Sequence, residues 1–186
     1  MNSRTEIILD FWFNQTPHEK RFKRDEAFDN EIRKRFLKDY NLAKSNEYDD
    51  WLKNPRECLA LIILLDQFSR NLFRDKKEAF ELDSKARLAV NEGVYSGYLK
   101  ELNYSERLFF LLPLIHSEEI IDHEKAYKLM DKYLINHPDI NTIKKFWLDH
   151  TNAIKKFSRY PHRNKTLGRQ STAEEIKFLN GPNSSW

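Results

Sequence analysis

Residues 54–74 read NPRECLALIILLDQFSRNLFR, and this stretch decides the fold class. Asn54, Pro55 and Glu57 supply a helix cap, a first-turn proline and a capping-box acid directly ahead of a long apolar run. At about 100° per residue, the apolar side chains of this run cover nearly the whole circumference of the helix. We therefore expect a central helix that is buried on both faces.

The remainder of the chain predicts an all-α protein. Of its 186 residues, four are glycine and six are proline, while 33% are charged, which favours helices over many short strands. Capping signals and four-residue apolar repeats indicate about eight helices, arranged as irregular antiparallel helical hairpins. We expect a single helical domain over residues 1–186, with a C-terminal basic turn and short helix at 159–180 packed on it. The tail, residues 183–186, is expected to dock by its aromatic end.

Several helix boundaries are predicted from single residues. A helix over 77–92 is expected to end at Gly93, where a left-handed residue closes the C-terminus. The next helix is expected to begin at a Ser105 cap and to be kinked by Pro113, because proline lacks an N–H and clashes with the preceding turn. A further helix is predicted over 124–135.

Cysteine content and the lengths of the apolar runs restrict the environment of the protein. Cys58 is the single cysteine and has no disulfide partner, and the N-terminus lacks the apolar core of a secretory signal. No apolar stretch approaches the roughly 20 residues that span a bilayer, because Asp66 interrupts the longest run. These features predict a cytoplasmic protein with no membrane contact.

Charge and motif content restrict the partners. The net charge of +3 is small and evenly spread along the chain, so the sequence as a whole does not indicate a nucleic-acid partner. It contains no glycine-rich phosphate loop and no dinucleotide fingerprint, so we expect no cofactor. No feature of the sequence specifies an oligomeric state.

The polar residues of the central helix form the first candidate site. Asp66 stands four residues before Arg70, which is the favourable order for a helical ion pair, and Arg74 follows one turn later on the same side. A structural ion pair is one interpretation. An anion-binding arginine pair held by Asp66, or a catalytic carboxylate, are the alternatives. Gln67 and Asn71 flank the group in each case.

Histidines mark the second candidate site. His150 interrupts the apolar line of a long helix near the C-terminus, and it is either a core histidine bonded to a neighbour or a general base. His116, Ser117 and Glu118 follow the predicted kink and form either a cavity site or a solvated helix end. His150, His116 and Glu118 are therefore the candidate catalytic groups, and Ser117 is a candidate ligand contact.

The same region contains residue types that bind metal ions. His116, Glu119 and His123 could share one helical face and hold a divalent cation. The sequence has no His-Glu-x-x-His core, and its single cysteine excludes a thiolate zinc site. We therefore expect no metal site.

The third candidate site is the basic stretch RYPHRNKTLGR at residues 159–169. Arg159, His162, Arg163 and Asn164 are its candidate ligand contacts, because arginines can fork onto phosphate or carboxylate oxygens. The alternative is a C-terminal clamp whose arginines bond the carbonyl groups at helix ends.

Four motifs, taken in order, resemble a known family. They are LDFWF, LDQFSRNLFR, LPLIHSEE and FSRYPHRNKTLGRQSTAEEIKFL. The chain resembles the bacterial and plant proteins of domain-of-unknown-function family 924 from Ile7 to about Trp186. The resemblance implies an all-helical fold of the tetratricopeptide-repeat-like superfamily and no established reaction. The motif positions are Trp12, Asp66, Gln67, Arg70, Asn71, Arg74, His116, Ser117, Glu118, His150, Arg159, His162, Arg163 and Asn164.

This chain departs from the family pattern at three positions. Ser69 stands where relatives often carry proline, and Ser158 where they often carry glycine, so local kinks are expected to differ. His123 stands where relatives commonly carry glutamine. A ligand set peculiar to one member would not explain the shared motifs, which further disfavours a metal site.

Three functions remain open on the sequence. The first is a basic pocket for a small anionic ligand bearing phosphate or carboxylate, with or without acid–base chemistry. The second is a helical-hairpin module that binds a protein or peptide, in which the polar motifs are internal struts. The third, ranked last, is RNA contact through the C-terminal basic stretch.

Overall fold

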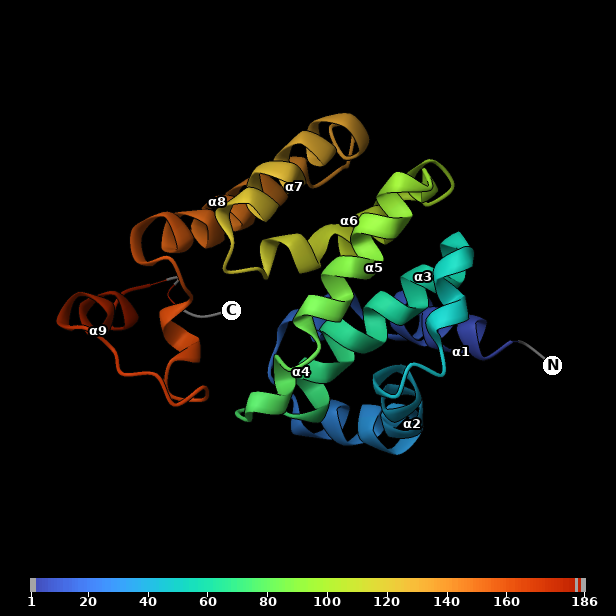
Figure 1. Cartoon of the computed structure of the whole chain (residues 1–186), viewed down its shortest axis with the longest axis horizontal. Coiled ribbons are helices and arrows are strands. Elements are labelled where there is room, and N and C mark those ends of the chain that lie inside the picture. The colour runs from blue at the N-terminus through green and yellow to red at the C-terminus, as the bar shows by residue number, and fades with distance from the viewer. Residues whose placement is uncertain (1–2, 183, 185–186) are drawn as a thin grey trace. The chain divides into compact units, whose positions relative to one another are not determined.

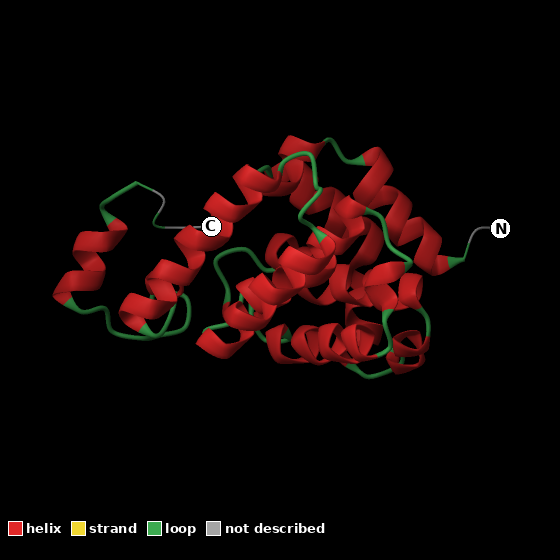
Figure 2. Cartoon of the chain, turned by 90° about the horizontal axis from the view of Figure 1, so that it is seen from above, coloured by secondary structure: helices red, strands yellow, loops and turns green. Residues whose placement is uncertain are grey.

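The computed structural model describes residues 3–182 and 184, and all the regular structure in that part of the chain is helical (Figures 1 and 2). The predicted all-α class is confirmed. The α-helices are α1 (Arg4–Asp10), α2 (Glu26–Lys44), α3 (Pro55–Ile62), α4 (Ser69–Leu72), α5 (Asp83–Tyr95), α6 (Tyr104–Ile115), α7 (Ile120–Tyr133), α8 (Ile140–Phe157) and α9 (Ala173–Leu179).

Short segments of other helix types complete the architecture. A π-helical turn at Ile63–Phe68 joins α3 to α4, so these nine α-helices amount to eight continuous ones, in agreement with the predicted number. A second π-helical turn, Phe11–Gln15, extends α1. The 3-10 turns are His18–Phe22, Asp49–Lys53, Lys77–Ala79, Tyr98–Lys100 and Pro161–Arg163. The predicted docking of the tail involves residues 183, 185 and 186, which lie outside the described residues.

The chain divides into two compact units by its internal contacts. Unit 1 consists of Met1–Arg74 and Glu78–Pro113, and unit 2 of Asp75–Lys77 and Leu114–Trp186. The single domain over residues 1–186 and the tetratricopeptide-like superfamily both stay predictions.

The core of unit 1 is built on the helix over residues 55–72. Every residue from 58 to 66 has no solvent exposure. The α3 segment packs on α1 and α5, and the π-helical turn packs on α2 and α5, which confirms burial on both faces. Asn54 caps α3 by accepting the Arg56 N–H at 3.0 Å, as predicted.

The core of unit 2 is built on α7 and α8, which pack against each other. Ile143, Trp147 and Ile154 of α8 are buried along one face, and His150 lies among them with 2% exposure. Ser158 ends α8 in the left-handed conformation, with φ 55°. The α9 helix packs on α8 through the rings of Phe178 and Phe157, whose centroids are 5.2 Å apart.

The structure corrects three predicted boundaries. Gly93 lies inside α5, and the left-handed residue that follows the helix is Gly97, with φ 80°. The N-terminus of α6 is capped by Asn103 and not by Ser105, because Asn103 accepts the Glu106 N–H at 3.0 Å and Glu106 accepts the Asn103 N–H at 2.9 Å.

The other boundaries lie close to Pro113. The proline is inside α6, which ends two residues later at Ile115. The helix predicted over 124–135 is α7, which begins earlier, at Ile120. Ser117 accepts the Glu119 N–H at 3.1 Å, so a side chain outside the helix satisfies the backbone just ahead of it.

Gly93 is required for close packing and not for a turn. A Cβ at this position would lie closer to Phe110 Cζ than side-chain atoms approach in real proteins, and it would also crowd Tyr98 Cδ2 at 3.1 Å. Phe110 has no solvent exposure, so its ring cannot swing into water to make room. The glycine therefore sets the separation between α5 and α6.

We expect Gly93→Ala to destabilise unit 1 by about 2 kcal/mol, the order of the cost of overpacking a rigid core. The free energy of unfolding, measured by urea denaturation, tests this expectation. Glu92→Ala, an exposed change on the same helix, is the control and should alter stability by less than about 0.5 kcal/mol. Equal stability of the two variants would show that α5 and α6 can separate without cost.

Candidate functional site

In unit 1, the π-helical turn of the central helix carries Asp66 and Gln67. Asp66 has no solvent exposure, and its Oδ2 accepts a hydrogen bond from Gln67 Nε2 at 2.5 Å. Arg70 reaches Asp66 Oδ1 at 3.4 Å, which confirms the predicted helical ion pair. The guanidinium group also pairs with Asp83 at 2.8 Å and donates to the carbonyl of Ala79. One arginine thus links the central helix to the start of α5.

Arg74 binds a different carboxylate. Its Nε and a terminal nitrogen donate to the two oxygens of Asp29 at 2.6 and 2.7 Å, a bidentate pair. Asn71 Nδ2 donates to the same carboxylate at 2.8 Å. The expectation that Arg70 and Arg74 form one group with Asp66 is therefore wrong, because the helix ends after Leu72 and Arg74 turns towards α2.

These contacts decide what the unit 1 residues can do. The partners Asp29 and Asp83 were missed on the sequence, because they lie far along the chain from their arginines. A buried carboxylate is stable only when it is paired and hydrogen-bonded, and both requirements are met here. The geometry favours internal struts at Asp66, Arg70 and Arg74.

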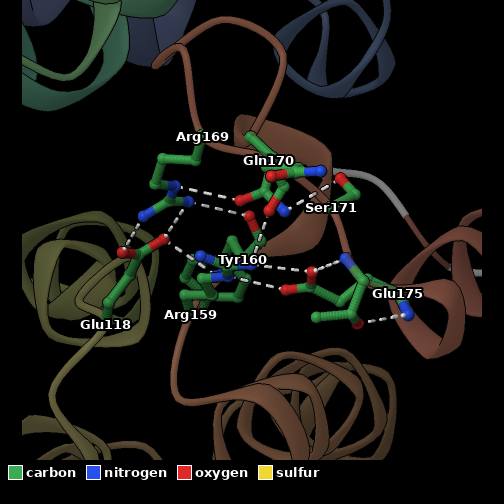
Figure 3. A network of polar contacts seen from close by, with 9 residues as sticks. Glu118, Arg159, Tyr160, Arg169, Gln170, Ser171 and Glu175 are labelled. Carbon is green, nitrogen blue, oxygen red and sulfur yellow. Dashed lines mark hydrogen bonds and ion pairs between the residues drawn. The ribbon is translucent and has the colours of Figure 1, made fainter.

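In unit 2, Glu118 joins the start of α7 to the C-terminal basic stretch (Figure 3). Arg169 donates to its two carboxylate oxygens at 2.6 and 2.9 Å, and the Tyr160 N–H donates to it at 2.8 Å. Burial alone would raise the pKa of Glu118, but the bonds from Arg169 and Tyr160 outweigh burial and hold that pKa below its ordinary value. Glu118 is therefore an ionised carboxylate already bound to a cation.

Arg159 forms a second bidentate pair, with Glu175 of α9 (Figure 3). Its nitrogens donate to the carboxylate at 2.6 and 2.8 Å, and Glu175 also accepts the Thr172 N–H at 2.7 Å in a capping box. The bond from Arg159 is the main cause that lowers the pKa of Glu175 to about 2. Glu175 has 1% exposure, so this pair fixes α9 to the basic stretch.

Asn164 completes this network. It has 1% exposure, it accepts a hydrogen bond from Arg169 Nε at 2.9 Å, and its Nδ2 donates to Ser171 Oγ at 3.0 Å. Arg169 and Glu175 are charged members of this network that the sequence did not single out as site residues. The clamp predicted at the C-terminus had arginines bonded to helix-end carbonyl groups, whereas Arg159 binds the carboxylate of Glu175.

Ser117 and His123 serve the turn between α6 and α7. Ser117 Oγ donates to Asp122 at 2.6 Å. The ring nitrogens of His123 lie 2.9 Å from Thr151 Oγ1 and from the Ser117 carbonyl oxygen, so both are engaged inside the protein. Across the described residues, no three His, Cys, Asp or Glu side chains are grouped to hold a metal ion.

The remaining candidates gather around the ring of Tyr160, which has no solvent exposure. The ring centroids of His150 and His162 lie 5.8 and 5.5 Å from it, and the guanidinium of Arg163 lies 4.5 Å from it. His116 is 6.2 Å from His150, ring to ring. We call these five residues the Tyr160 cluster. It combines four of the predicted site residues with Tyr160, which lies in the same motif as His162 and Arg163.

His150 is a neutral member of the Tyr160 cluster. Burial, followed by repulsion from His116, lowers the pKa of His150 to about 2. Its Nδ1–H donates to the Phe146 carbonyl oxygen at 2.8 Å, which leaves Nε2 as the unprotonated nitrogen. A group with so low a pKa is a weak base at neutral pH. The low pKa and the bond to Phe146 therefore favour a core or hydrogen-bonding role for His150 over proton transfer.

The fold and these contacts define an all-helical protein whose sequence motifs are held by internal ion pairs. The model of the family described as "Bacterial protein of unknown function (DUF924)" matches residues 8–183, and the chain belongs to this family. No curated protein matches the chain. A solved structure described as a protein of unknown function, ATU0120 from Agrobacterium tumefaciens, is similar, with 34% identity and a TM-score of 0.85 over 95% of this chain and 96% of that one.

No helix in the described part of the chain has both the length and the apolar character of a membrane span.

Removal of the Arg159–Glu175 pair should change the acid stability of the protein. Because the folded pKa of Glu175 is about 2, against an ordinary value of 4.5, its ionised form stabilises the fold above about pH 4.5 and loses this effect as the pH falls towards 2. Glu175→Gln should therefore be less stable than wild type at pH 7, with a gap that narrows between pH 5 and pH 3. Denaturation at several pH values measures the gap, with exposed Glu174→Gln as the control. A gap that is constant over this range would contradict the assigned pKa.

His150 should contribute a separate pH dependence. It takes up a proton near pH 6.5 in the unfolded chain but only near pH 2 in the folded protein, so stability falls as the pH drops below about 6.5. The slope from this single group is at most about 1.4 kcal/mol per pH unit. His150→Gln should flatten the stability curve between pH 6.5 and pH 4.5, whereas exposed His18→Gln should not. An unchanged slope in His150→Gln would mean that the unfolded and folded chains bind this proton equally.

Proposed function

We propose that this protein binds a small anionic ligand, bearing phosphate or carboxylate, at the Tyr160 cluster of unit 2. One observation carries the proposal: Arg163, His150 and His162 converge on one buried aromatic ring, and His116 lies against His150. A guanidinium donates from each of its nitrogens and an imidazole from its N–H, and these groups suit phosphate and carboxylate oxygens. The N–H of His150 already binds the Phe146 carbonyl, so Arg163, His116 and His162 are the proposed donors.

The contacts elsewhere in the protein support this choice of location. Arg70, Arg74 and Arg159 each form an ion pair with a buried or largely buried carboxylate. An anionic ligand at any of them would compete with a carboxylate of the protein itself. His116 and His162 are partly exposed, so a ligand can approach the cluster from solvent.

Binding is proposed in preference to a reaction. Of the three candidate catalytic groups, Glu118 is ionised and bound to Arg169, and His150 is neutral with a pKa of about 2. His116 is the remaining group that could transfer a proton to or from a bound ligand. A site in which one candidate of three can act is better suited to recognition than to acid–base chemistry.

Direct titration tests the proposal. Inorganic phosphate, pyrophosphate and citrate are titrated into wild type, Arg163→Gln and His162→Gln, with calorimetry and the melting temperature as readouts. We expect saturable binding of at least one anion to wild type and at least tenfold weaker binding to Arg163→Gln, about 1.4 kcal/mol for the lost charge-assisted bonds.

Lys165→Gln is the matched control, because it removes an exposed positive charge from the same stretch. It should bind the anion as tightly as wild type does. Failure of all three anions to bind folded wild type would exclude the proposed ligand class. Equal weakening in Lys165→Gln and Arg163→Gln would indicate general attraction to a basic surface and no defined site.

A further inference from the structure

Trp12 belongs to the LDFWF motif and is part of the core of unit 1. Three aromatic rings of unit 1 face one guanidinium group, that of Arg21. Its central carbon lies 5.9 Å from the ring centroid of Trp12, 5.8 Å from that of Phe13 and 5.7 Å from that of Phe109. We call these three rings the aromatic cage.

The rings of the cage fix one another. Phe109 stands edge-on to Trp12 and to Phe13, with interplanar angles of 86° and 77° and centroid separations of 5.5 and 5.6 Å. Trp12 and Phe13 are consecutive residues of the π-helical turn Phe11–Gln15, a distortion that occurs frequently at functional sites. Trp12 has no exposure and Phe109 has 1%, so these two walls are parts of the rigid core.

The half-buried guanidinium of Arg21 fills the cage without a carboxylate partner. It donates to the backbone carbonyl oxygens of Phe13 and Thr16, both at 2.9 Å, and no carboxylate of the described residues forms an ion pair with it. Its Nε is buried without an acceptor. Burial lowers the pKa of Arg21, with no carboxylate to compensate. The other arginines of the polar motifs in unit 1, by contrast, each hold a carboxylate.

The indole Nε1 of Trp12 is likewise buried and has no hydrogen-bond partner. Buried donors are nearly always satisfied in folded proteins, so an unpaired one on a residue of the cage favours a ligand that brings an acceptor atom. A ligand that carries an acceptor next to its positive charge would satisfy this donor, and the guanidinium of Arg21 cannot, because it has no acceptor.

The segment that carries Arg21 is held over the cage by few contacts. The 3-10 turn His18–Phe22 has no buried residue. Phe22 is 51% exposed, and its ring stacks on Phe109 with a centroid separation of 6.0 Å. The ring of His18 lies 5.1 Å from that of Phe22. Because this turn contributes so little to the core, its displacement would leave the rest of unit 1 packed.

We propose that the cage of Trp12, Phe13 and Phe109 is a binding site for a small organic cation of the quaternary-ammonium or guanidinium type, and that Arg21 is its internal occupant, displaced when the ligand binds. Cations with spread charge bind strongly to aromatic faces, and cages of two to four rings are the usual means of recognising them. Arg21 then lowers the apparent affinity, because a ligand must first displace it. The site lies in unit 1 and does not depend on the anion site.

Choline serves as the probe, because it combines a quaternary ammonium with a hydroxyl acceptor, and 3,3-dimethyl-1-butanol serves as its uncharged equivalent. The readout is the NMR signal of the Trp12 indole N–H, assigned with Trp12→Phe. Wild type, Arg21→Ala, Arg21→Gln and Lys23→Ala are titrated. Lys23 is an exposed cation of the same segment and provides the matched control.

We expect a saturable shift of the Trp12 signal by choline, at least tenfold tighter in Arg21→Ala and Arg21→Gln than in wild type and Lys23→Ala, and no shift by the alcohol. Adding Phe13→Leu to Arg21→Gln should weaken the binding again. If neither Arg21 variant folds, the titration of wild type tests the proposal, because choline at higher concentration must still shift the NMR signal of the Trp12 indole N–H. No perturbation in any folded protein, or an equal response to the alcohol, would overturn the proposal.

Discussion

A carboxylate without solvent exposure stands in the middle of the central helix, and the packing of unit 1 depends on how its charge is balanced. Asp66 obtains a hydrogen bond from Gln67 and an ion pair from Arg70, and Arg70 in turn binds Asp83 at the start of α5. Removing one member of such a group leaves an uncompensated buried charge, which is far more costly than the net stability of the intact pair suggests. The group therefore specifies which surface of α5 faces the central helix.

The same rule organises unit 2. Arg159 binds Glu175 and Arg169 binds Glu118, and each pair joins segments that are distant in sequence. Two arginines of the basic stretch, Arg159 and Arg169, therefore stabilise its own turn and the position of α9. Arg163 and His162 of the same stretch lie against the ring of Tyr160. A count of charges along the sequence would have overstated the positive potential of this stretch, because it includes cations that the protein itself neutralises.

Local features of the sequence predicted local features of the structure. The Asn54 cap, the fully buried central helix and the Asp66–Arg70 pair follow from spacings of a few residues, and all are present. The partner of Arg74 did not follow, because Asp29 is 45 residues away in the chain and only the folded arrangement of α2 brings it near. The assumption of 100° per residue also fails over Ile63–Phe68, where the π-helical turn holds an extra residue.

Glycine positions illustrate a second limit of prediction. Gly93 has the sequence context of a helix end, yet it lies inside α5 because Phe110 of α6 occupies the space that a side chain would need. The reason for this glycine is a tertiary contact and is invisible in its neighbours along the chain. Candidate sites have the same limit, since the Tyr160 cluster draws its members from two separate motifs and from α8.

The arginines of this protein differ in the groups that bind them, and this difference distinguishes fixed structural contacts from contacts that a ligand can replace. Arg70, Arg74 and Arg159 are held by carboxylates, whose attraction persists inside the protein where screening by water is weak. Arg21 is held by aromatic rings and two backbone oxygens, so its attraction to the cage is one that any similar cation can reproduce. A protein that needed Arg21 only as a strut would gain from a carboxylate at its buried Nε, and none is there among the described residues. The cage is thus better matched to a cation that comes and goes than to one that is fixed.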